Sequence, residues 1–177
     1  MALLPIILTP EPVLRETAKP VETITDELLK LLDDMADTMY DAPGIGLAAN
    51  QVGRLERVIV MDCAKEGAAP ELWKMINPEI ISRSDELAVL EEGCLSIPDQ
   101  TADVERPAIV EVKYTDIAGK EQRLTCEGLL AACVQHEVDH LDGVLFIDHI
   151  SRLKRDMIIR RFMKEMRQSS VGAPKGQ

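Results

Sequence analysis

Hydrophobic residues recur every three or four positions between residues 27 and 40, which predicts an amphipathic helix there. Thr25 can cap the start of this helix, and Pro43-Gly44 follow its end. One face of the helix is apolar throughout and is expected to pack against the core; it carries Leu28, Leu31, Leu32, Met35, Ala36 and Met39.

Three further helices are predicted from periodicity and from the residues that end helices. Residues 128–141 form a mostly apolar helix, and Gly143 provides its C-terminal stop. A short helix is expected at residues 11–18, where Pro12 suits the first turn. A basic helix is expected at residues 151–168.

Strands are predicted between these helices, because β-branched residues and alternating polarity dominate there. Residues 116–120 join the last two strands as a hairpin turn. The order of elements predicts an α+β fold, with antiparallel β-sheets around the central helix 128–141, N-terminal helices and a C-terminal helix. The predicted strands are 57–62, 73–77, 79–82, 87–90, 108–115 and 122–126.

The chain has 177 residues, which fits one domain. We expect a single catalytic domain over residues 1–168, including the helix 151–168, and a disordered tail over residues 169–177, which are rich in Gly, Pro and Ser. No apolar run approaches the ~20 residues of a membrane span. The four cysteines have no framework spacing, which favours reduced thiols and a cytoplasmic location; they are Cys63, Cys94, Cys126 and Cys133.

Charge is distributed unevenly along the chain. The net charge of −11 argues against general nucleic-acid binding and against specific DNA binding. From Arg152 onward, however, there are eight basic and two acidic residues, against 12 basic and 29 acidic residues before it. This basic segment is either a docking element for an anionic partner or a solvated helix face, and both interpretations stay open.

The most informative chemistry lies in the helix 128–141. His136 and His140 are four residues apart, so both imidazoles face the same side of a helix, and Glu137 can act on a water molecule beside a bound metal ion. A His-Glu-x-x-His match can arise by chance on a surface helix. Here the motif shares one stripe with Cys133 in an apolar helix, where burial of these groups is unfavourable unless they are paired or metal-bound. The pattern therefore favours a metal-dependent hydrolase; the remaining histidine, His149, stands outside any motif.

Two histidines need a third protein ligand if one position is to stay open for water. The metzincin spacing would place a histidine where this chain has Phe146. A thermolysin-like site would use a later glutamate, and Glu165 in the basic segment is the only one after Glu137. Cys94 is the best candidate, because a thiolate binds first-row divalent metals strongly and Gly93 permits close approach of the backbone.

Three segments taken together resemble the signature motifs of the peptide deformylase family. They are Gly44–Gln51 (GIGLAANQ), Glu92–Ser96 (EGCLS) and Gln135–His140 (QHEVDH), in the order found in that family. The likeness extends over about residues 13–150 and is strongest to the bacterial type with a C-terminal helix. It implies a metal-dependent hydrolase that removes the formyl group from N-formylmethionine at the N-terminus of nascent polypeptides.

The resemblance also implies roles for particular residues. The metal ligands would be Cys94, His136 and His140, holding one divalent ion, with Fe²⁺ expected in the cell and Zn²⁺, Ni²⁺ or Co²⁺ as alternatives. Glu137 would move the proton. The Gln51 side chain and the backbone N–H of Leu95 would donate to the developing oxyanion; these three residues form the catalytic set Glu137, Gln51 and Leu95.

The resemblance implies a pocket for the methionine side chain at five apolar positions: Ile45, Leu90, Leu129, Ala132 and Cys133. Ile45 and Gly46 would also pair through their backbone with the extended peptide, as an added strand. Ala132 is smaller than the Ile or Leu frequent in the family, which predicts a roomier pocket. Thr101 stands where some relatives carry an arginine near the substrate. Glu92 and Arg106 are a candidate ion pair beside the metal site.

The basic C-terminal helix resembles the ribosome-docking extension of bacterial relatives. The partners expected are therefore N-formylmethionyl nascent peptides and, through this helix, the ribosome, with no membrane contact. Two other classes of function are alternatives: a metal-holding protein without catalysis and a metallopeptidase. A non-catalytic scaffold has no need for Glu137 as a base or for Gln51 as an oxyanion donor, and cleavage of formyl peptides rather than internal peptide bonds separates the two enzymes.

Overall fold

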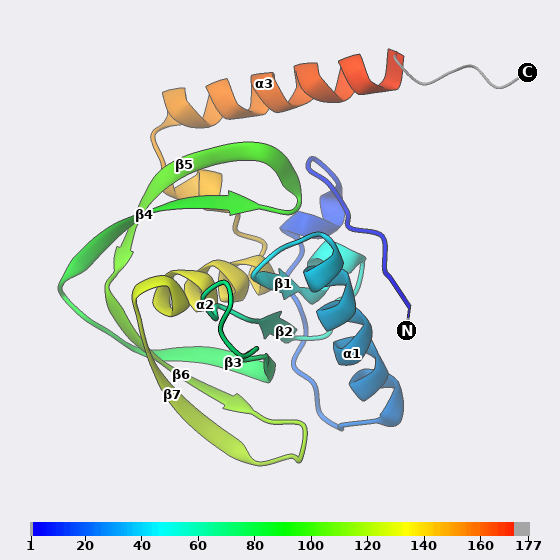
Figure 1. Cartoon of the computed structure of the whole chain (residues 1–177), viewed down its shortest axis with the longest axis vertical. Coiled ribbons are helices and arrows are strands. Elements are labelled where there is room, and N and C mark those ends of the chain that lie inside the picture. Colours follow the sequence, from blue (N-terminus) through cyan, green and yellow to red (C-terminus); the bar gives the residue numbers. More distant parts are fainter. Residues whose placement is uncertain (1, 172–177) are drawn as a thin grey trace, which may run out of the picture.

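Two antiparallel sheets surround one helix in the computed structural model, which describes residues 2–171 (Figure 1). The larger sheet has the strand order β1-β2-β3-β6-β7, and β4 and β5 form a separate hairpin. The strands are β1 Gly46–Ala48, β2 Val58–Met61, β3 Trp73–Arg83, β4 Leu87–Cys94, β5 Ile97–Pro107, β6 Ile109–Thr115 and β7 Glu121–Glu127.

The helix between the two sheets is α2, Gly128–Leu141, and its bounds match the prediction. Helix α1, Asp26–Asp41, begins at Thr25, whose hydroxyl oxygen accepts a hydrogen bond of 3.1 Å from the backbone N–H of Leu28. Helix α3, Arg152–Val171, lies across the outside of β5 (Figure 1). These elements confirm the predicted α+β fold. Within residues 2–171, no helix is long and apolar enough to cross a bilayer.

The apolar side of α2 packs against the larger sheet. Val134 and Leu141 of the helix share a buried cluster with Met75, Val110 and Val112 of the sheet. The polar residues of the motif therefore lie on the side of α2 that faces the β4–β5 hairpin, where His136 contacts Glu92 of β4. This packing brings the second and third motifs of the sequence together.

The structure differs from the predicted elements at both ends of the chain. The helix expected at 11–18 is only a four-residue 3-10 helix, η1, Pro12–Arg15, because the chain is extended again at Glu16. Helix α3 continues three residues beyond the predicted end at 168. The rest of the predicted tail, residues 172–177, lies outside the described residues.

Three further differences lie in the sheets. Pro78 was expected to separate two strands, but β3 runs through it, since Asn77 adopts a positive φ of 51° and the pairing register shifts at this point. Strand β5 was not predicted, and neither was the short β1, which leads into the 3-10 helix η2, Ala49–Val52. Another 3-10 helix, η3 at Phe146–His149, connects α2 to α3.

Candidate active site

Two histidine nitrogens and one sulfur converge between α2 and the end of β4. The Nε2 atoms of His136 and His140 are 3.2 Å apart, and the Sγ of Cys94 lies 3.4 Å from Nε2 of His140. All three donor atoms are within 4.8 Å of one another. The i, i+4 spacing on α2 puts the two imidazoles on the same side, and the β4–β5 hairpin carries the thiol to them.

This group fits a divalent first-row metal ion. With metal–nitrogen bonds of about 2.0 Å and a metal–sulfur bond of about 2.3 Å, tetrahedral ligands lie roughly 3.3–3.6 Å apart, close to the separations seen here. Both histidines are buried, and burial lowers the pKa of His140 well below its ordinary value, which keeps that ring neutral as a ligand must be. Two imidazoles and one thiolate leave a fourth position open in a tetrahedral site.

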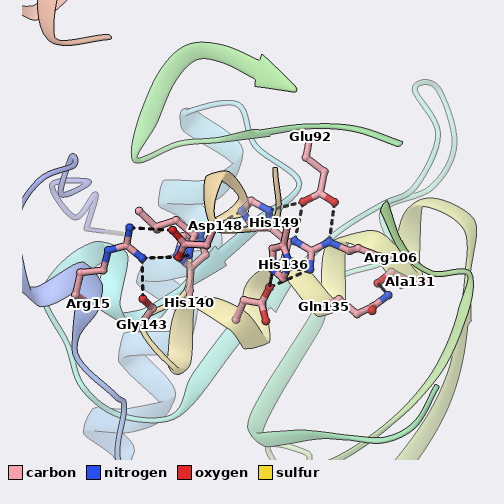
Figure 2. A network of polar contacts seen from close by, with 12 residues as sticks. Arg15, Glu92, Arg106, Ala131, Gln135, His136, His140, Gly143, Asp148 and His149 are labelled. Atoms are coloured by element: carbon pink, nitrogen blue, oxygen red, sulfur yellow. Dashed lines mark hydrogen bonds and ion pairs between the residues drawn. The ribbon is translucent and has the colours of Figure 1, made fainter. Parts of the chain in front are cut away.

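A buried carboxylate orients the first histidine (Figure 2). Oε1 of Glu92 lies 2.9 Å from Nδ1 of His136. Burial opposes ionisation of Glu92, but the hydrogen bonds from His136 and Arg106 outweigh it and lower the pKa of Glu92 to about 2. An ionised carboxylate only accepts, so Nδ1 of His136 carries the hydrogen and Nε2 keeps its lone pair for a metal ion.

The predicted contact between Glu92 and Arg106 is present as a buried ion pair with two hydrogen bonds, of 2.7 and 3.0 Å. Arg106 also donates to Asp139 of α2 at 2.9 Å. The sequence left His149 without a role, but its Nε2 lies 2.7 Å from the same oxygen of Asp139. A connected set of polar groups therefore reaches from the candidate metal ligand His136 to the partly exposed His149 (Figure 2).

Glu137 is buried next to the backbone of the first motif. Burial raises the pKa of Glu137 to about 7, and its Oε2 has no hydrogen-bond partner within residues 2–171. A Cβ at Gly46 would lie only 2.5 Å from Oε1 of Glu137. A side chain at position 46 would therefore have to displace the carboxylate from the space that it occupies.

Gln51 is almost completely buried and its amide is held at both ends. Its Oε1 accepts from the backbone N–H of Ala48 at 3.0 Å, and its Nε2 donates to the Ser96 hydroxyl at 3.0 Å. The same Nε2 lies 3.5 Å from Sγ of Cys94. The amide donor is thus directed at the metal-binding group. Leu95 follows Cys94 in the tight turn between β4 and β5.

A cavity of about 570 Å³ opens beside these groups. Ile45 and Leu129 are about half exposed at its mouth, while Ala132 and Cys133 are buried in its wall. His140 is fully buried and does not line the cavity. Every other residue of the predicted site lines it: Ile45, Gly46, Gln51, Leu90, Cys94, Leu95, Leu129, Ala132, Cys133, His136 and Glu137.

Four residues of this region were missed by the sequence interpretation: Ser96, Gln100, Asp139 and His149. Ser96 and Asp139 lie inside the second and third motifs, so proximity could have suggested them. Gln100 lies in a strand that was not predicted, and His149 in an unpredicted 3-10 helix. No spacing pattern connects either of these to the site.

A Cys/His/His group with two buried histidines, a partly buried thiol and a neighbouring carboxylate, facing a mostly apolar cavity, is the arrangement of a metal-dependent hydrolase. Residues 3–156 match the family model described as Polypeptide deformylase. The chain belongs to this family. It is an enzyme that removes the formyl group from the N-terminal N-formylmethionine of polypeptides by metal-dependent hydrolysis.

Relatives and solved structures agree with this assignment. The chain is 58% identical to the peptide deformylase of Rhizobium meliloti over 164 residues, which cover 93% of this chain and 94% of the relative. The crystal structure of a peptide deformylase from Legionella pneumophila is similar, with a TM-score of 0.90 and 44% identity, covering 98% of this chain and 100% of that one. The peptide deformylase of Ehrlichia chaffeensis in complex with actinonin has a TM-score of 0.88 and 38% identity, covering 93% and 98%.

Proposed function

We propose that Glu137, Gln51 and the backbone N–H of Leu95 perform the hydrolysis at a metal ion held by Cys94, His136 and His140. The observation that carries this proposal is the convergence of the three donor atoms within 4.8 Å beside the buried carboxylate of Glu137. A non-catalytic metal-holding protein would gain nothing from an unpaired buried carboxylate at this point, since such a group is unfavourable for folding.

When bound, the ion supplies Lewis acidity and lowers the pKa of water toward neutrality. We propose Fe²⁺ in the cell, with Zn²⁺, Ni²⁺ or Co²⁺ able to occupy the same ligands. A set of two imidazoles and one thiolate is suited to all four. Because intrinsic affinity favours zinc over ferrous iron, metal supply would decide which ion is present.

The protein groups divide the remaining work. Glu137 accepts the proton of the attacking water and delivers it to the leaving amine, a role suited to a pKa of about 7. The Gln51 amide and the Leu95 N–H donate to the oxygen of the formyl group as it gains charge. The Gln51 amide is held in place beforehand by Ala48 and Ser96, so little reorganisation is needed.

The cavity supplies specificity for methionine. Ala132 and Cys133 form its buried wall, Leu129 is about half exposed, and Leu90 is a half-buried residue of the lining. An unbranched thioether fits such an apolar cavity, and the small Ala132 leaves it roomy. Ile45 and Gly46 would pair through their backbone with the extended peptide, as an added strand.

Formate release tests this proposal directly. The iron-loaded protein is expected to release formate from formyl-Met-Ala-Ser, and removal of the metal by a chelator is expected to abolish the activity until Fe²⁺ is restored. The same peptide without its formyl group is expected to stay intact, because this enzyme, unlike a metallopeptidase, does not cleave internal peptide bonds. Absence of formate from the fully metallated protein would falsify the proposal.

We further propose that residues 1–168 form one catalytic domain and that its compartment is the cytoplasm, where nascent chains begin. Ile158 and Phe162 of α3 are buried in one cluster with Ile97 and Val104 of β5, which supports α3 as part of that domain. The exposed side of α3 is strongly basic. This charge supports docking on the ribosome near emerging chains.

Ribosome docking predicts a salt-dependent affinity that depends on the outer face of α3. Reversing three exposed charges there, Arg160→Glu, Arg161→Glu and Lys164→Glu, is expected to weaken cosedimentation with ribosomes by about tenfold or more, because each contact to a phosphate releases a counterion. Binding by this variant as tight as that of the wild-type protein, at low and at high salt, would contradict the docking surface. A matched control reverses three exposed basic residues elsewhere: Lys65, Arg83 and Lys120.

A further inference from the structure

Helix α3 packs directly onto the hairpin that carries the metal ligand Cys94. Phe162 of α3 is buried in a cluster with Ile97 of β5, and Cys94 packs against the same cluster. Figure 1 shows α3 lying across the outside of β5. The C-terminal helix is therefore close enough to the hairpin to influence the cavity from behind.

One polar contact crosses from α3 to the lining of the cavity. Nε2 of Gln100 donates a hydrogen bond of 3.0 Å to Oε2 of Glu165. Gln100 is only 2% exposed and lies between Asp99 and Thr101, which also line the cavity. Glu165, considered above as a metal ligand of the thermolysin type, thus contacts a residue of the substrate cavity instead of the metal-binding group.

This contact determines which way the Gln100 amide points. A carboxylate only accepts hydrogen bonds, so the NH₂ of the amide must face Glu165 and the carbonyl oxygen Oε1 must face away from it. Within residues 2–171, Oε1 of Gln100 has no hydrogen-bond partner although it is buried. A buried acceptor in this state is unfavourable until a donor reaches it.

The segment around Gln100 is held close behind the metal ligand. A Cβ at Gly93 would lie 3.3 Å from the backbone oxygen of Gln100, and Asp99 is in the left-handed region with a φ of 64°. Asp tolerates this conformation better than most residues, and such backbone is often found at ligand sites. Gln100 is therefore held in place by the backbone around it as well as by its contact with Glu165 of α3.

We propose that Oε1 of Gln100 accepts a hydrogen bond from a backbone N–H of the bound peptide beyond its methionine, and that Glu165 is the positioning residue that directs this acceptor. The inference rests on the proposed function, because it concerns the same cavity and an extended peptide within it. It makes α3 a part of the peptide-binding site. Both ends of the Gln100 amide then have partners when peptide is bound.

Reversing the charge at position 165 tests the orientation. In Glu165→Lys the new ammonium only donates, so it favours rotation of the Gln100 amide and presents NH₂ to the cavity in place of the acceptor. KM for formyl-Met-Ala-Ser is expected to rise roughly 2- to 10-fold, the worth of one neutral hydrogen bond, with kcat unchanged. KM for formyl-methionine methyl ester, which has no N–H beyond its methionine, is expected to stay the same.

A second substitution is expected to rescue the first. In the double variant Glu165→Lys, Gln100→Glu, the new carboxylate accepts from the new ammonium and still offers an oxygen to the cavity. KM for the tripeptide should return toward the wild-type value in this double variant. Gln100→Glu alone places two carboxylates together, so its KM should not match the wild-type value. Asp156→Lys makes the same change of charge elsewhere on α3 and serves as the control.

The outcomes separate this inference from the proposed function. A rise in KM confined to the tripeptide, reversed in the double variant, supports it. An equal rise for tripeptide and ester, or an equal effect of Asp156→Lys, contradicts it and leaves only a structural role for the contact. A wild-type protein that releases no formate from either substrate contradicts the proposed function and this inference with it.

Discussion

Replacing Glu137 by glutamine is expected to lower kcat for formyl-Met-Ala-Ser by about 10²- to 10⁴-fold, the usual contribution of a positioned general base. Glutamine keeps the shape of the side chain but cannot accept and return a proton at neutral pH. The proposed ligands Cys94, His136 and His140 are unchanged, so the metal content should stay near one ion per chain. Formate release and metal analysis on the same preparation measure the two quantities together.

The position of the Glu137 carboxylate explains why a second variant is informative. Because a Cβ at Gly46 would lie 2.5 Å from Oε1, Gly46→Ala should displace the carboxylate without removing it. Its loss of kcat should be smaller than that of Glu137→Gln, and combining the two changes should add little, since they act on one group. Fully additive losses, or wild-type kcat in Glu137→Gln with a loaded metal, would exclude Glu137 as the base.

Helix α2 and the β6–β7 hairpin could be predicted from the sequence, because hydrophobic periodicity and turn residues mark them clearly. Helix α2 begins at Gly128 and ends before Gly143, and both glycines have the positive φ that marks a helix boundary here, 58° and 74°. The hairpin β6–β7 also follows the prediction, because Asp116 accepts hydrogen bonds within the turn and stabilises it locally. In these segments the local preferences agree with the final fold.

Strand β5 could not be predicted, because its residues do not carry the pattern of a strand. It contains Pro98 and Pro107 and several charged residues, and it is held by pairing with β4 over almost its whole length. The contact between Gln100 and Glu165 could not be predicted either, because the two residues lie 65 positions apart in the sequence. Contacts of this kind depend on tertiary packing, so the motifs point to the candidate ligands and to Glu92, which orients His136, while the contact between Gln100 and Glu165 is visible only in the structure.

The second large effect is expected at Arg106. Arg106→Met should lower the free energy of unfolding by about 3–5 kcal/mol, because it leaves the buried carboxylate of Glu92 without its cationic partner. Glu92 also orients His136, so the affinity for the metal ion should fall about 10- to 100-fold. Urea denaturation of the metal-free protein measures the first quantity, and competition with a chromogenic chelator measures the second.

A double variant separates the two contributions of Glu92. In Arg106→Met, Glu92→Gln no charge remains buried in this pair, so much of the lost stability should return, while the glutamine oxygen can still accept from Nδ1 of His136 and retain part of the metal affinity. Arg123→Met is the matched control: Arg123 and its partner Glu121 are both well exposed, at 60% and 61%, and the loss there should stay below about 1 kcal/mol. If Arg106→Met cost no more than this control, the ion pair would not support the metal site, and His136 would have to be held by the packing of α2 alone.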